Sequence, residues 1–112
     1  MVSPVEREVL SLATEDWYAI WSIAEAVRRT FPQMDARKRT SLAQATAKHL
    51  LSEGLIYLTE GFSDQHCLTA TEAGAALADE KQWQPGAPDT PVCFTATKEG
   101  ERVYYNLPPE NE

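Results

Sequence analysis

The chain has 112 residues and a mass of 12.5 kDa, which is enough for one domain and too little for two. Hydrophobic residues make up 43% and charged residues 24% of the sequence, a balance that argues against disorder. No apolar run approaches the roughly 20 residues that span a bilayer, and the first residues lack the basic start and apolar block of a secretory signal. The two cysteines lack CxxC spacing and are too few for a disulfide scaffold, so we expect a reduced, cytoplasmic protein.

The net charge of −7 disfavours a protein that coats nucleic acid, but the charges are unevenly distributed. Residues 28–48 contain six basic residues and one acid, a local charge of +5, so the rest of the chain carries −12. Such an asymmetry indicates local contact with an anionic partner. A solvated helical face on an acidic protein produces the same pattern, and the charges alone leave both interpretations open.

Two amphipathic helices are predicted in the first third of the chain. Ser3 and Glu6 have the spacing of a capping box, and the proline between them suits the first position of a helix that runs to about residue 14. Apolar residues at helical spacing predict a second helix that begins between residues 17 and 22 and that Pro32 ends.

A third helix is predicted between Asp35, which can cap its start, and Glu53, with Gly54 as its stop. One side of this helix is apolar. The other side has no acid and no large apolar group, and we call it the polar stripe: Arg37, Ser41, Gln44, Lys48 and Ser52.

The second half of the chain predicts two β-hairpins with a helix between them. Residues 55–59 and 66–69 are short β-rich runs around a turn and indicate the first hairpin. A capping box then opens a helix over residues 70–83. The remaining segments are an irregular connector (84–91), a second hairpin (92–107, with strands 92–97 and 102–107) and an acidic tail (108–112). We therefore expect a single domain over residues 1–107.

This order of elements, three helices followed by a β-hairpin, resembles the winged helix-turn-helix. The segment Leu50–Ile56 (LLSEGLI) resembles the exit of the recognition helix and the first wing strand of MarR-like and PadR-like transcriptional regulators. The segment Leu68–Gly74 (LTATEAG) resembles their second wing strand and the capped start of the next helix. The resemblance covers residues 3–83. It implies an α+β, mainly α fold with three helices, a β-hairpin wing and a fourth helix, here followed by the additional C-terminal β-hairpin.

The resemblance also implies a DNA-binding transcriptional regulator that acts as a homodimer, with the third helix in the major groove. The residues that would contact double-stranded DNA are Arg37, Lys38, Arg39, Thr40, Ser41, Gln44 and Lys48. The Gln44 amide has the chemistry that reads an adenine edge, and the two hydroxyls can bond phosphate or base. The basic side chains would hold phosphates, which set affinity and register without reading sequence.

The expected wing departs from the family pattern, because its tip, residues 61–65, carries an acid and a phenylalanine where basic residues would grip DNA. The alternative is a winged-helix module that binds a protein partner and no DNA. Its contacts would be aromatic: Phe62, Tyr57 and the cluster Trp17, Tyr18 and Trp21. Packing in the core is the competing interpretation of those side chains.

The charge around the third helix distinguishes the two functions. A continuous positive face through Arg28, Arg37 and Lys48 favours DNA. Neutralisation of that face by Glu25, Asp64 or the acidic tail favours a protein partner.

The sequence has no catalytic motif, so we expect neither enzyme activity nor a cofactor. It contains no GxSxG, no glycine-rich phosphate loop and no HExxH. His66 and Cys67 are adjacent in an expected strand, so their side chains point to opposite faces. A metal site from His49, Cys67 and Cys93 has no recognised spacing.

Overall fold

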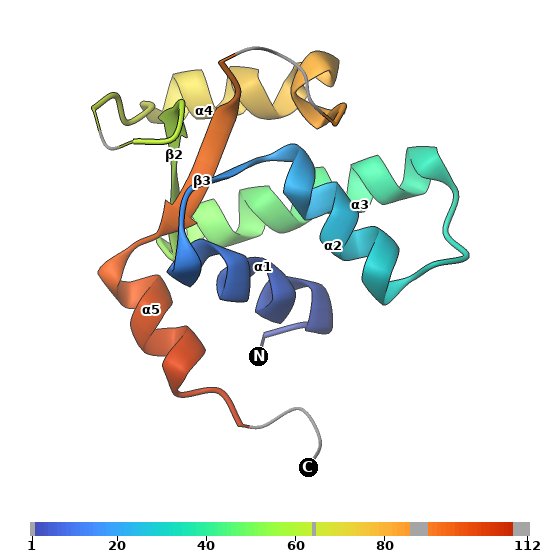
Figure 1. Cartoon of the computed structure of the whole chain (residues 1–112), viewed down its shortest axis with the longest axis horizontal. Coiled ribbons are helices and arrows are strands. Elements are labelled where there is room, and N and C mark those ends of the chain that lie inside the picture. Colours follow the sequence, from blue (N-terminus) through green and yellow to red (C-terminus); the bar gives the residue numbers. More distant parts are fainter. Residues whose placement is uncertain (1, 64, 86–89, 109–112) are drawn as a thin grey trace.

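Helices surround a small antiparallel sheet in the part of the chain that the computed structural model describes, residues 2–63, 65–85 and 90–108 (Figure 1). The helices are α1 (Pro4–Glu15), α2 (Trp21–Thr30), α3 (Ala36–Ser52), α4 (Ala70–Ala78), the 3-10 helix η1 (Glu80–Trp83) and α5 (Lys98–Tyr105). The strands are β1 (Tyr18–Ala19), β2 (Ile56–Glu60) and β3 (Val92–Ala96). This confirms the α+β, mainly helical class. None of the helices in the described ranges is long and apolar enough to cross a membrane.

The helices α1 and α3 begin at the capping residues that the sequence predicts, whereas α2 begins after Ile20 without a side-chain cap. Ser3 and Glu6 form a reciprocal capping box at α1, and the Asp35 carboxylate accepts a hydrogen bond from the backbone N–H of Lys38 at the start of α3. At the end of α3, Gly54 has φ +70°, a conformation that glycine adopts without steric cost. The N–H of Leu55 donates to the carbonyl of Leu50, which completes a Schellman-type cap.

The sheet has the strand order β1-β3-β2, so the last strand in the sequence lies at its centre. Phe94 of β3 lies opposite Tyr18 on one side and opposite Leu58 on the other. The Phe94 side chain is fully buried in the single hydrophobic core, together with Leu10, Ile23 and Leu50 from the three N-terminal helices.

The predicted hairpin pairing of residues 55–59 with 66–69 is present only in reduced form. Residues 66–68 make only an isolated bridge, Thr59 to Cys67, and two neighbouring backbone hydrogen bonds. The strand that pairs with β2 along its length is β3. β3 lies on the other edge of β2, where Val92, Cys93, Phe94 and Thr95 are all buried, whereas Cys67 is exposed and Leu68 is only half-buried.

A repeated motif supplies both neighbours of β2. Residues 67–74 (CLTATEAG) and 93–100 (CFTATKEG) share the pattern C-x-T-A-T-x-x-G. Both cysteines lie opposite Thr59, one on each side of β2. The second copy pairs with β2 over five residues, whereas the first makes one bridge.

The predicted C-terminal hairpin is wrong, because residues 98–105 form α5. The Thr97 hydroxyl caps this helix by accepting a hydrogen bond from the N–H of Gly100, and Glu99 pairs with Arg102 one turn on. The alternation of Val103, Tyr105 and Leu107 suggested a strand, but three alternating apolar residues in so short a segment do not exclude a helix. The α5 helix packs against α1 (Figure 1). The acidic residues 109–112 and part of the connector (86–89) lie outside the described residues.

Gly100 allows α5 to begin directly against the backbone that leaves α3. A Cβ at this position would lie 1.9 Å from the carbonyl oxygen of Leu55. That same oxygen accepts a hydrogen bond from the N–H of Thr97, and the Thr97 hydroxyl bonds the carbonyl of Gly54. The motif glycine of the second copy is therefore required by a close backbone approach.

We expect Gly100→Ala to lower the free energy of unfolding by about 1–3 kcal/mol or more, because the added methyl must displace backbone. The matched control is Gly74→Ala, at the equivalent position of the first copy, where a Cβ meets nothing within 4 Å. That change exchanges a helical glycine for alanine and is expected to stabilise the protein by about 0.5–1 kcal/mol. Urea unfolding of the two variants measures both effects, and equal destabilisation by the two would contradict the assigned contact.

Candidate nucleic-acid interface

Helix α3 is the element to which every predicted DNA-contacting residue belongs. Its buried side carries Ala43, Thr46, Ala47 and Leu50. It packs against α2 and against α4, which lies beside it (Figure 1). One side of α3 therefore remains for solvent or for a partner.

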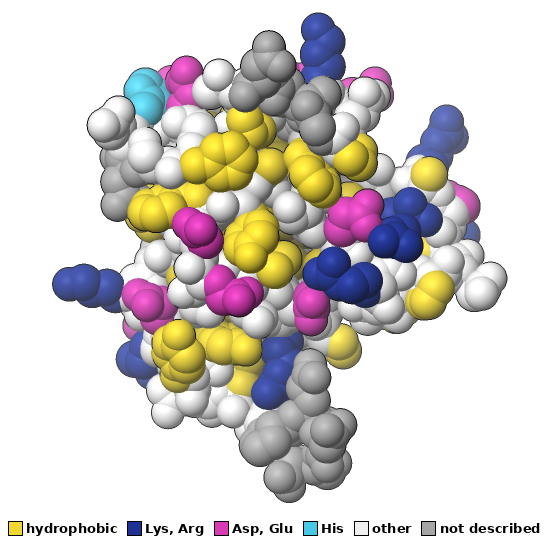
Figure 2. Space-filling model, in the orientation of Figure 1, with side chains coloured by type: hydrophobic (Ala, Val, Ile, Leu, Met, Phe, Trp, Pro, Cys, Tyr) yellow, Lys and Arg dark blue, Asp and Glu magenta, His cyan; other side chains and the backbone are white. Residues whose placement is uncertain are grey.

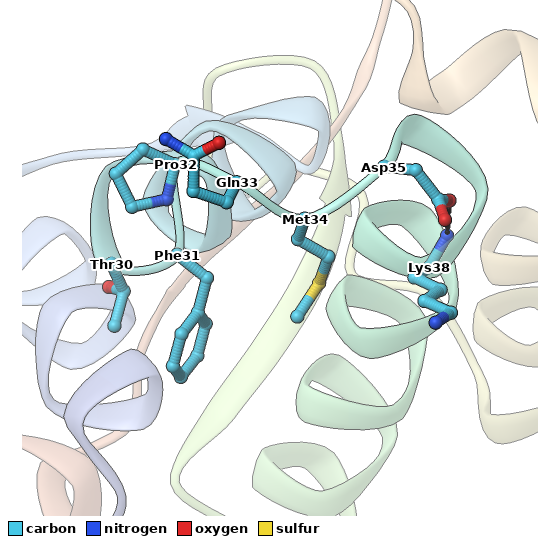
Figure 3. A pocket seen from close by; sticks show the side chains of 7 residues that line it. All are labelled: Thr30, Phe31, Pro32, Gln33, Met34, Asp35 and Lys38. Atoms are coloured by element: carbon cyan, nitrogen blue, oxygen red, sulfur yellow. Dashed lines mark hydrogen bonds between the residues drawn. The ribbon is translucent and has the colours of Figure 1, made fainter.

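The turn between α2 and α3 lines a shallow depression in the surface, and apolar side chains are exposed there. In Figure 3 the side chains of Phe31 and Met34 point to the same side of the turn, and Lys38 lies beside Asp35. Phe31 is 42% exposed. The guanidinium of Arg39 donates a hydrogen bond of 3.2 Å to the carbonyl of Met34 and is half-buried. Arg39 thus stabilises the turn, and its predicted role as a phosphate ligand has no support from this placement.

The exposed side of α3 is a continuous line of residues at alternating spacings of three and four. We call it the exposed stripe: Lys38, Ser41, Ala45, Lys48 and Ser52, all of which are exposed. Arg37 is exposed next to it. No acid lies on α3. The exposed stripe differs from the polar stripe by a small rotation about the helix axis. Ala45 occupies the place expected for Gln44, and Lys38 occupies the place expected for Arg37.

Gln44 faces α4 instead of solvent. Its Nε2 donates a hydrogen bond of 2.9 Å to the carbonyl of Leu77 at the end of α4, and the indole N–H of Trp83 donates to the same oxygen, also at 2.9 Å. Thr40 is half-buried and lines a cleft with Arg37 and Glu80. Because the amide N–H already has a partner inside the protein, the structure does not present Gln44 as a free base-reading group.

The three cations on the exposed side of α3, Arg37, Lys38 and Lys48, have no ion pair with any described residue. On α2, by contrast, the cations are paired with acids: Arg28 lies 2.8 Å from Glu25, and Arg29 lies 3.0 Å from Glu8. Figure 2 shows acidic and basic side chains next to each other over α1 and α2. The positive face of α3 thus does not continue onto Arg28, although Lys81 of η1 and Lys98 of α5 are further exposed cations without an ion pair to a described residue.

An acidic border lies along the C-terminal half of α3. The Nδ1 of His49 forms a hydrogen-bonded ion pair with Glu6 of α1, and its Nε2 lies 3.4 Å from Glu53. The hydrogen bond with Glu6, its charge and that of Glu53 raise the pKa of His49. Burial alone would raise the pKa of Glu6, but hydrogen bonds from Ser3 and His49 outweigh burial and lower it.

An apolar groove of about 390 Å³ lies between α3, β2 and α4. Leu51, Tyr57, Leu68 and Ala73 are among the residues that line it, and Lys48 stands at its edge. The aromatic cluster of β1 and its neighbours is elsewhere, with Trp17, Tyr18 and Trp21 each half-buried. Phe62, by contrast, is 59% exposed.

The residues considered for a metal site do not form one. Among the described residues, no group of three or more His, Cys, Asp or Glu side chains is arranged to hold a metal ion. Cys93 is fully buried, and burial raises the pKa of its thiol to about 11, so it is not a reactive thiolate at neutral pH.

Comparison with protein-family models, with curated proteins and with solved structures gives no match for this chain.

The Glu6–His49 pair predicts a pH dependence of stability. The pKa of His49 in the folded protein lies above its ordinary value of 6.5, so its contribution is present below pH 6.5 and is lost as the pH rises through the folded pKa. The pKa of Glu6 lies below 4.5, so its contribution is lost only as the pH falls below that value. We expect the free energy of unfolding to decline as the pH rises above 6.5.

Urea unfolding of His49→Gln over the same pH range measures the effect, because glutamine keeps a polar side chain and removes the titrating group. The decline should flatten in this variant. His66→Gln removes the other histidine and serves as the control that keeps the decline. If His49→Gln declined as steeply as the unmodified protein, the ion pair would not be its source.

Proposed function

We propose that this chain is a winged-helix domain that binds duplex DNA with the exposed stripe of α3 in the major groove. The observation that carries the proposal is a set of three cations, Arg37, Lys38 and Lys48, that have no ion pair with a described residue and lie on an exposed helix face without acids. They occur in a chain whose net charge is −7 and whose α2 cations are paired with acids. Unpaired cations grouped on one helix are suited to an anionic partner.

The arrangement of the neighbouring elements supports the same proposal. Residues 31–35 join α2 to α3 as the turn of a helix-turn-helix. The α1 helix packs against both of these helices, and the sheet packs against α3 through β2. The wing in this proposal is the connection from β2 to β3, residues 61–91, which contains α4 and η1 in place of a simple loop.

The dimensions of the stripe suit the major groove. Lys38 and Lys48 are ten residues apart, which corresponds to about 15 Å along an α-helix. The major groove of B-form DNA is about 12 Å wide. The two lysines can therefore reach phosphates on opposite walls of the groove, while Ser41 and Ala45 between them face its floor.

The expected affinity is modest for one copy of the chain. Three phosphate contacts give a slope of log K against log salt concentration of about −2.7. Two copies on one duplex double the number of contacts, so we propose that the domain binds as a homodimer.

We expect Lys48→Ala to weaken binding to all duplexes alike and to reduce the salt slope by about one unit per copy. Fluorescence anisotropy with labelled mixed-sequence duplexes over a range of salt concentrations measures both quantities. The matched control is Arg102→Gln, which removes one positive charge from α5, where Arg102 is already paired with Glu99. An equal loss in both variants would show that net charge alone governs binding.

A second candidate function is a winged-helix module that binds a protein partner. The observations that favour it are the pairing of Arg28 with Glu25, which interrupts the positive face, and the apolar groove beside Lys48. The binding experiment separates the two functions. If no duplex is bound at about 50 mM salt, where electrostatic attraction extends beyond 10 Å, the DNA proposal is overturned and the protein-binding module is the better account.

A further inference from the structure

The centre of the exposed stripe is formed by small side chains, with cations only towards its ends. Ser41 and Ala45 lie between Lys38 and Lys48 on the same line. In a helix that lies in the major groove, residues at the centre of the exposed side come closest to the base edges. Small side chains at that point let the helix backbone approach closely, whereas long ones would hold it away.

The Ala45 side chain is a methyl group that is exposed to solvent. It cannot donate or accept a hydrogen bond, so the feature of a base pair to which it can respond is an apolar one. In the major groove the only such feature is the 5-methyl group of thymine, which alanine contacts in protein–DNA complexes.

The side-chain amide of Gln44, next to Ala45, could form hydrogen bonds with a base, but it already has a partner inside the protein. The Nε2 of Gln44 donates its hydrogen bond to the carbonyl of Leu77 inside the protein. The cations on either side of Ala45 bind phosphates, which carry no sequence information. The Ser41 hydroxyl can bond to any of the bases and discriminates little. Ala45 is therefore the residue on this face with a definite base preference.

We infer that Ala45 is a specificity-determining residue whose methyl group packs against the 5-methyl group of a pyrimidine in the major groove. The inference rests on the proposed binding of duplex DNA by α3. It names the base feature that the helix reads, a methyl group at the pyrimidine 5-position. The domain should accordingly prefer thymine to uracil at the contacted position.

The experiment uses one mixed-sequence duplex, about two helical turns long, in three forms. The first contains thymine, the second contains uracil at every thymine position, and the third is the uracil duplex with every cytosine methylated at the 5-position. These forms differ only in the methyl groups in the major groove. We expect the unmodified protein to bind the uracil duplex about twofold to fivefold more weakly than the thymine duplex. Methylation of cytosine should restore part of the loss.

Two variants assign the effect to one side chain. Ala45→Gly removes the methyl group, and we expect it to bind the three duplexes equally. Ala75→Gly makes the same change at an exposed position of α4 and should keep the preference of the unmodified protein. Both variants lower helix propensity by the same amount, so their melting temperatures show whether folding contributes to any difference.

The outcomes separate the inference from the function on which it rests. If the unmodified protein binds none of the three duplexes at about 50 mM salt, the proposed DNA binding fails and the inference fails with it. If it binds all three equally, or if Ala45→Gly keeps the preference for methyl groups, DNA binding stands and the contact with Ala45 is overturned.

Discussion

The strand β3 lies between β1 and β2 and carries Phe94 into the centre of the core. This position constrains the rest of the structure, because it ties the segment after α1 and the segment after α3 to a strand near the C-terminus. It also fixes the start of α5, since Thr97 and Gly100 follow β3 directly and bond or contact the backbone of Gly54 and Leu55. The end of α3 is therefore held in place by residues more than forty positions away in the sequence.

The connection from β2 to β3 leaves and returns at one place, because Glu60 lies opposite Val92, and it contains α4 and η1. Ala73 and Leu77 of α4 and Trp83 of η1 are buried in the same core as the N-terminal helices. The Leu77 carbonyl receives hydrogen bonds from both Gln44 and Trp83. The segment is thus part of the domain, and it determines which side of α3 remains exposed.

Local signals in the sequence predicted α1, α3 and the start of α4, because caps act over three or four residues, but α5 was not predicted. Ser3 with Glu6 and Asp35 before α3 are confirmed as caps. Strand pairing could not be predicted in the same way. Two copies of one motif, residues 67–74 and 93–100, fit β2 locally, and no local signal shows that the second pairs along the whole strand while the first makes one bridge.

The same limit applies to the candidate site. The polar stripe was predicted from helical spacing, which identifies the polar half of α3 but not the position of a neighbouring helix. The α4 helix covers Gln44, and the exposed line therefore passes through Ala45. Alanine gives no polar signal, so no pattern in the sequence would have singled out this residue.

The distribution of charge within the fold determines whether an acidic protein can hold DNA. The molecule measures 40 × 33 × 20 Å along its principal axes, whereas the Debye length at physiological ionic strength is about 8 Å. In the proposed complex, acids on the surfaces farthest from α3 are largely screened from the duplex, while Lys38 and Lys48 are close to its phosphates.

At about 0.01 M salt the Debye length grows to about 30 Å, and repulsion from the acidic remainder extends to the duplex. The plot of log K against log salt concentration should therefore flatten at low salt for this domain. A uniformly basic protein would instead follow a straight line. Such curvature is the result expected when a small cationic helix face belongs to an otherwise acidic protein.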